Sequence, residues 1–134
     1  MNDITCTVIR DEKVWQSDLP GLRPLMNWLD NEPDVLEGSY VIDKVVGKAS
    51  ALLLVYGKAA KVHGKTMSKA ADEVLTRYGI EHSWDRMVDY IENNTRTDMC
   101  PMEKKVVSID DPVLAYEIFH SFFQQKRLEA KQAV

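Results

Sequence analysis

The stretch that decides the fold is residues 43–56, which read DKVVGKASALLLVY. Most of its residues are apolar, so a helix formed by this stretch would have almost no polar face. A helix without a polar face belongs in the interior of a domain, where it has neighbours on most sides. We therefore predict one buried helix over residues 43–56 that stops at Gly57.

The residues before this segment are predicted to form a hairpin and a helix. Two short apolar runs, 4–8 and 14–15, flank the polar turn 10–13 and indicate two paired strands. Apolar residues at the i, i+3, i+4, i+7 spacing of a helix then fill residues 22–29. The N-terminal third of the chain is thus expected to be strand, strand and helix.

After the buried segment, strands and helices are predicted to alternate. We expect a strand over 59–63, a helix over 68–78, a short strand over 80–82 and a helix over 83–91. Asp111 and Pro112 suit the start of a terminal helix, as N-cap and first helical residue. Strands that alternate with helices indicate an α/β domain, in which helices cover a sheet.

Size and charge narrow the class of protein. The 134 residues fit one domain over 1–134, with a polar C-terminal tail from about residue 125 that is expected to fray. Lys and Arg total 17 against 21 Asp and Glu, a net charge of −4 that argues against nucleic acid or an anionic membrane as partner. The longest apolar run, 51–56, is too short to span a bilayer. The two cysteines lie far apart, and the first residues lack the basic stretch and the long apolar stretch of a signal peptide, so we expect a cytoplasmic protein. A homo-oligomer is left open.

Two motifs carry a resemblance to a known family. DKVVGKA at residues 43–49 and CPME at residues 100–103 resemble an uncharacterised prokaryotic family, a domain of unknown function with a cytidine-deaminase-like fold. The resemblance runs from about residue 36 to residue 118. It implies a three-layer α-β-α sandwich with a mixed sheet of about five strands, on which the buried helix and the helix from Ser68 pack. It implies no established activity.

The zinc chemistry of deaminases is not expected here. Those enzymes use three His or Cys ligands and a proton-shuttling glutamate, in an H-x-E…P-C-x-x-C pattern. Aligned by the resemblance, Gly47 and Ala49 stand in place of the first ligand and the glutamate, and Ser68 and Ala71 in place of the paired cysteines. The three histidines are isolated from one another, so they suggest no other ligand set. We predict no metal, no cofactor and no hydrolytic deamination.

A candidate ligand site centres on Lys48, a cation inside an otherwise apolar helix that needs an anionic partner. Asp43, Gly47 and Ser50 share one face of the predicted helix, and Lys44 lies next to Lys48 on the neighbouring face. In deaminase-like folds two helix N-termini converge over the pocket, and their free N–H groups favour an anion. We predict a small anionic, for example nucleotide-like, ligand with Lys48 as its counter-charge. The predicted site comprises Asp43, Lys44, Gly47, Lys48, Ser50, Ser68, Cys100 and Glu103.

Each part of this prediction has a rival. Lys48 can pair with Asp43 or with a carboxylate such as Glu103, which would leave no pocket. Cys100 is a candidate nucleophile because Pro101 can begin a helix behind it, yet no base is placed nearby, and a lone cysteine is commonly buried for packing. Two functions therefore stay open: a ligand-binding protein or zinc-independent enzyme, and a catalytically inactive interaction or sensor module.

Overall fold

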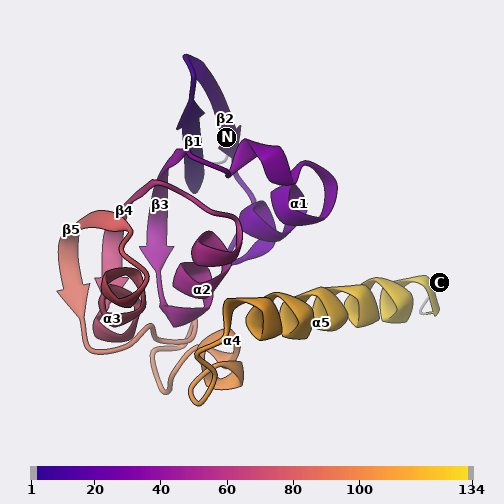
Figure 1. Ribbon diagram of the computed structural model, residues 1–134. Helices are drawn as coiled ribbons and strands as arrows, with labels where there is room; N and C mark the ends of the chain where they lie inside the picture. Colours follow the sequence, from indigo (N-terminus) through magenta and orange to yellow (C-terminus); the bar gives the residue numbers. More distant parts are fainter. Residues whose placement is uncertain (1–2, 133–134) are drawn as a thin grey trace.

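The computed structural model describes residues 3–132, which form one mixed five-stranded sheet with helices packed on it (Figure 1). The strands are β1 (Cys6–Arg10), β2 (Lys13–Ser17), β3 (Tyr40–Val46), β4 (Lys61–Ser68) and β5 (Glu81–Val88). They lie in the order β2-β1-β3-β4-β5. The β1 strand is antiparallel to both of its neighbours, whereas β3, β4 and β5 are parallel.

The helices connect these strands and close the chain. They are α1 (Arg23–Asn31), the 3-10 turn η1 (Pro33–Val35), α2 (Lys48–Tyr56), α3 (Lys69–Arg77), α4 (Pro101–Lys105) and α5 (Pro112–Gln132). Because β3, β4 and β5 are parallel, each connection between them carries a helix, α2 and then α3. These two helices begin at the edge of the sheet where β3 and β4 end, as Figure 1 shows.

The α2 helix is the centre of the hydrophobic core. Leu52, Leu53 and Leu54 are completely buried, because α2 contacts α1, α3, α4 and α5 as well as β3. In β3, the buried residues Val41 and Asp43 alternate with partly exposed ones, so one face of that strand carries the core. This confirms the prediction of a helix buried on most sides.

The predicted start of that helix is wrong. Asp43–Val46 belongs to β3, and the helix begins only at Lys48, with Gly47 as its N-cap. The β-branched pair Val45-Val46 continues the apolar run Tyr40-Val41-Ile42, and a buried parallel strand and a buried helix look alike in such a run. Consequently Asp43 does not share a helix face with Gly47 and Ser50.

Two further predictions need correction. Residues 83–91 form no helix, because Glu81–Val88 is a strand that pairs in parallel with β4, with Ser83 opposite His63. Pairing in the sheet outweighs the helical spacing of Trp84, Met87 and Val88. The tail that was predicted to fray from about residue 125 is helical in the structure, since α5 continues to Gln132 and extends away from the sheet (Figure 1).

Most of the other elements agree with the sequence, although the strand predicted over 59–63 extends over Lys61–Ser68. The hairpin, the first helix and the Ser68 helix are confirmed, and the Ser68 hydroxyl accepts a hydrogen bond from the Ala71 N–H at 3.1 Å. The terminal helix begins at Pro112, where Asp111 accepts from the Val113 N–H at 2.9 Å. The α/β class and the mixed sheet of five strands are confirmed, whereas the third layer of the sandwich stays a prediction. None of the helices within residues 3–132 has the length and apolar character needed to cross a membrane.

Candidate functional site

The N-terminus of α2 is occupied by the chain's own Glu103. Glu103 Oε1 accepts a hydrogen bond from the Lys48 N–H at 2.7 Å, and Oε2 accepts one from the Ala49 N–H at 2.9 Å. These are two of the N–H groups that a helix start leaves without a partner, and a carboxylate there also meets the positive end of the helix dipole. Glu103 therefore sits as an internal anion where the sequence predicts an anionic ligand.

Gly47 allows this approach. A Cβ atom at Gly47 would lie 2.4 Å from Glu103 Oε1 and 2.7 Å from Oε2, much closer than two such atoms can be. The backbone of Gly47 has φ −97° and ψ −174°, angles that any residue adopts. The absence of a side chain is thus required by Glu103 alone.

Glu103 is one of the few charged side chains in the interior. It is buried, and burial raises the pKa of its carboxyl, while the N–H groups of Ala49 and Lys48 act in the opposite direction. A buried carboxylate is stable only where hydrogen bonds replace its water. The helix start of α2 supplies those hydrogen bonds.

The ammonium group of Lys48 has partners of its own. Lys48 Nζ donates to the Val107 carbonyl at 3.1 Å and pairs with Asp110 Oδ1 at 3.1 Å, and its side chain is 13% exposed. Arg77 also reaches Asp110 Oδ1, at 3.5 Å. Lys48 first, and Arg77 second, hold the pKa of the Asp110 carboxyl below its usual range. The ion-pair partner of Lys48 is therefore Asp110, and neither Asp43 nor Glu103 forms that pair.

Two clefts border Glu103, and together they contain all eight predicted site residues. The first, here called the Asp43 cleft, has a volume of about 350 Å³ and includes Asp43, Lys44, Gly47, Ser50, Cys100 and Glu103. The second, the Lys48 cleft, has a volume of about 250 Å³ and includes Lys48, Ser68, Arg77, Tyr90, Glu103 and Asp110. The structure thus separates Lys48 and Ser68 from most of the other predicted residues, and Glu103 lines both clefts.

Asp43 supplies the Asp43 cleft with a buried carboxyl. It is 6% exposed, and burial raises its pKa to about 7, although the backbone N–H groups of Val45 and Lys44 oppose this shift. Cys6 lies directly opposite Asp43 in the β1–β3 register. Burial, and then the charge of Asp43, raise the pKa of the Cys6 thiol. A carboxyl with a pKa near neutrality can donate or accept a proton, which is typical of functional sites.

Cys100 is half-buried at the start of α4 and lines the Asp43 cleft. Its N–H donates to the Ile91 carbonyl at 2.8 Å, which fixes the backbone before Pro101. Within residues 3–132, no base is hydrogen-bonded to its sulfur. The same range contains no group of three His, Cys, Asp or Glu side chains arranged to hold a metal ion.

Several residues of the site were not predicted. Asp110, Arg77 and Tyr90 line the Lys48 cleft, and Glu92 lines the Asp43 cleft. Asp110 lies just before the predicted terminal helix and carries no spacing signal that would link it to Lys48, 62 positions earlier in the sequence (110 minus 48). Only the fold brings the two side chains together.

Removal of the internal anion is expected to destabilise the fold. Glu103→Ala leaves two helix N–H groups, one of them buried, without their acceptor, which costs about 2 kcal/mol. Glu103→Gln keeps one acceptor oxygen and is expected to cost about half as much. Urea unfolding followed by circular dichroism measures both changes.

An exposed glutamate of α5 provides the matched control. Glu117→Ala removes the same side chain from the surface, where substitutions stay within about 0.5 kcal/mol. If Glu103→Ala and Glu117→Ala have the same small effect, Glu103 does not cap α2.

Comparison with known proteins gives a family and no activity. The family model described as TM1506: Domain of unknown function (DUF1893) matches residues 1–123. The crystal structure of a DUF1893-family protein (TM1506) from Thermotoga maritima is similar, with a TM-score of 0.81 and 33% sequence identity over 88% of this chain and 80% of that chain. None of the curated proteins matches. The predicted membership of a family of unknown function is confirmed, and its deaminase-like character stays a prediction. This chain belongs to the DUF1893 family.

Proposed function

We propose that this protein binds a small ligand in the Asp43 cleft. The observation that carries this proposal is the convergence of three separate segments on one cleft: the middle of β3 with Asp43, the first turn of α2 with Ser50, and the start of α4 with Cys100. The cleft also lies where β3 ends and α2 begins, and open α/β sheets bind ligands at the carboxyl ends of their strands.

The charges of the Asp43 cleft favour a ligand that donates hydrogen bonds. Asp43, Glu92 and Glu103 bring three carboxyl groups, and Lys44 brings the one cation in the cleft lining. The helix N–H groups that would attract an anion are already bound to Glu103. A neutral or cationic ligand with amino groups, such as the amino edge of a nucleobase, therefore suits this cleft better than a phosphate.

The Lys48 cleft supports a second candidate, the anionic ligand predicted from the sequence. Lys48 and Arg77 both converge on one oxygen of Asp110, whose side chain is 62% exposed. A phosphate or carboxylate of a ligand can replace that surface carboxylate. The first residue of α2 and the N-cap Ser68 of α3 line the same cleft, which also supports the proposal that the fold is deaminase-like.

A thermal-shift panel separates the two candidates. Nucleosides and amines represent the first ligand class, and nucleotides and sugar phosphates represent the second. A ligand present at 100 times its Kd stabilises the protein by about 2.7 kcal/mol. We expect a nucleoside or an amine to raise the Tm of wild-type protein and of Lys48→Ala, and to have no effect on Asp43→Asn.

The other results have equally clear meanings. Stabilisation by nucleotides or sugar phosphates that disappears in Lys48→Ala moves the site to the Lys48 cleft. A flat panel for wild-type protein contradicts both candidates. That result favours the catalytically inactive interaction or sensor module.

A further inference from the structure

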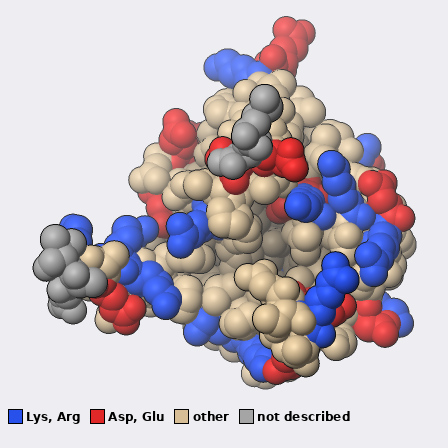
Figure 2. Space-filling view, turned by 180° about the vertical axis from the view of Figure 1, so that it is seen from behind, with Lys and Arg blue, Asp and Glu red and all other residues tan. Residues whose placement is uncertain are grey.

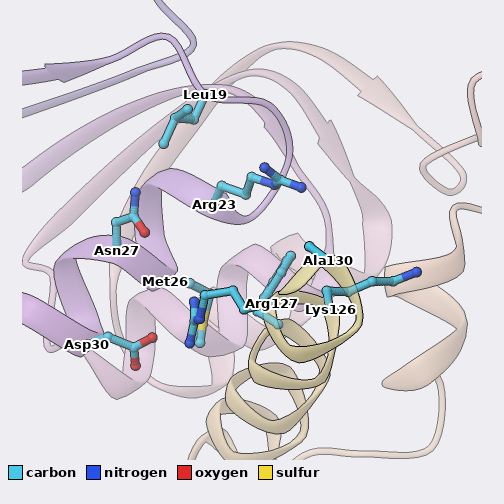
Figure 3. Close-up of a pocket in the computed structure, with 9 residues that line it drawn as sticks. Leu19, Arg23, Met26, Asn27, Asp30, Lys126, Arg127 and Ala130 are labelled. Carbon is cyan, nitrogen blue, oxygen red and sulfur yellow. The ribbon is translucent and has the colours of Figure 1, made fainter. Parts of the chain in front are cut away.

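A third cleft lies away from Glu103, between α1 and the C-terminal half of α5. It has a volume of about 310 Å³ and is here called the α1–α5 cleft (Figure 3). Leu19, Met26, Phe123 and Ala130 give it an apolar lining, in which Met26 is buried and part of the core. The cleft thus offers apolar surface to a molecule that enters from solvent.

The charges around this cleft are mainly positive. Arg23, Lys126 and Arg127 bring three cations, and Asp30 brings one carboxylate. Figure 2 shows Lys and Arg side chains gathered along the projecting end of α5. Unlike the surroundings of Glu103, this lining has an excess of positive charge.

The single carboxylate does not neutralise the arginines. Asp30 Oδ1 accepts a hydrogen bond from the Tyr116 hydroxyl and another from His120 Nδ1, the latter at 3.1 Å. The side chains of Arg23 and Arg127 form neither an ion pair nor a hydrogen bond with any residue in the described range 3–132, whereas the Arg23 backbone N–H donates to the Pro20 carbonyl at 3.3 Å. Two guanidinium groups therefore border apolar surface without a fixed anion.

The three cations are not equivalent in Figure 3. Arg127 extends from α5 toward α1, beside Met26 and in the direction of Asp30, and Arg23 extends from α1 above Ala130. Lys126 points away from α1 and lies near the Phe122 ring, with Nζ 5.6 Å from its centroid. The two guanidinium groups are thus placed to contact a molecule in the cleft, whereas Lys126, although it belongs to the lining, directs its ammonium group away from α1.

We propose that the α1–α5 cleft binds a small organic anion that carries an apolar body. A guanidinium group binds a carboxylate or phosphate through paired, charge-assisted hydrogen bonds, and the apolar body is stabilised by its removal from water against Met26 and Phe123. Lys126, Arg127 and Ala130 lie beyond residues 1–123, the part matched by the family model. The lining residues of the α1–α5 cleft differ from those of the Asp43 cleft, so the two proposed sites can be tested independently.

Titration calorimetry with simple amphiphiles tests this proposal. Octanoate and octyl phosphate carry both required groups, octanol lacks the charge, and inorganic phosphate lacks the apolar body. We expect the two organic anions to bind, and octanol and inorganic phosphate to bind at least about tenfold more weakly. Equal binding of octanol and octanoate, or no binding of either anion, overturns the proposal.

Three single variants locate the site, with Lys126 as the matched control. Arg127→Ala and Arg23→Ala are each expected to weaken octanoate binding at least about tenfold, and Lys126→Ala by less than about threefold. All three side chains are exposed, so the variants are expected to keep the wild-type circular dichroism spectrum. An equal loss in Lys126→Ala and Arg127→Ala overturns the proposal, because it indicates general attraction by surface charge.

Sedimentation with vesicles distinguishes a free ligand from a lipid surface. We expect the protein to stay in the supernatant with vesicles of anionic phosphatidylglycerol while it binds octanoate in solution. Sedimentation with these vesicles in the absence of octanoate binding contradicts the proposal, because the cleft would then serve a membrane surface.

Discussion

Gly47→Ala is expected to destabilise the protein by about 3 kcal/mol, although the backbone at this position accepts alanine. The new methyl group would lie 2.4 Å from Glu103 Oε1, so the carboxylate has to move. Overpacking of a buried site costs about 1–3 kcal/mol, and loss of the hydrogen bonds to Lys48 N–H and Ala49 N–H adds about 1–3 kcal/mol in the limit of full displacement.

Urea unfolding at neutral pH measures this change. The positive-φ positions Gly38 and Gly79 have open space around them, so alanine there acts through backbone strain alone and costs about 1 kcal/mol. An unchanged unfolding midpoint for Gly47→Ala would show that Glu103 does not need the space above Gly47.

Asp43→Asn is expected to make the protein more stable than wild type at neutral pH and to remove a pH dependence. Burial raises the pKa of Asp43 from its ordinary value of 3.8 to about 7 in the folded protein. Between these values the unfolded chain has lost the proton and the folded chain still holds it. Stability therefore falls as pH rises from about 4 to about 7, by up to about 1.4 kcal/mol per pH unit from this group.

The difference between the two proteins isolates this effect. Urea unfolding at several pH values should show that the free energy of unfolding of Asp43→Asn exceeds that of wild type by an amount that grows from pH 4 to pH 7. Above pH 7 this difference should stay constant. A difference that does not change with pH would contradict the buried, protonated state of Asp43.

The contribution of Asp89 to stability is expected to depend on pH in the opposite direction to that of Asp43. Its hydrogen bond and ion pair with Lys69 lower the pKa of Asp89. Any stability that this carboxylate adds is present above its unfolded pKa and is lost as pH falls through its folded pKa. Asp89→Asn should therefore lose stability relative to wild type at neutral pH, and the two proteins should converge in acid.

The sequence predicted the helix limits that depend on capping and stop residues within the same segment. Ser68 and Gly79 mark the limits of α3, and Asp111 marks the start of α5, because caps and stops act within a few residues. The boundary between β3 and α2 was missed, since a short apolar run such as the one around Val45 and Val46 can indicate either a buried strand or a buried helix. Only the start of β5 was predicted, as a strand over 80–82, and the rest was predicted as a helix, because the pairing partner of β5, β4, lies about 20 residues earlier in the chain.

The structure arranges the predicted site residues differently from the prediction. All eight residues line one or both of the two clefts that border Glu103, yet the sequence placed the anion outside the chain and gave Lys48 the central role. Whether Glu103 or an external ligand accepts the N–H groups at the start of α2 depends on where α4 packs. The spacing of residues in the sequence does not determine that packing. Asp110, the ion-pair partner of Lys48, was missed for the same reason.

A double-mutant cycle of Gly47 and Glu103 tests most directly whether Glu103 is the internal anion of α2. If the carboxylate alone forbids a side chain at residue 47, Gly47→Ala should cost about 3 kcal/mol in wild type and about 1 kcal/mol or less in Glu103→Ala. The predicted result is thus a coupling of about 2 kcal/mol between the two positions. Additive effects of the two substitutions would contradict it and would leave the start of α2 free for an external ligand.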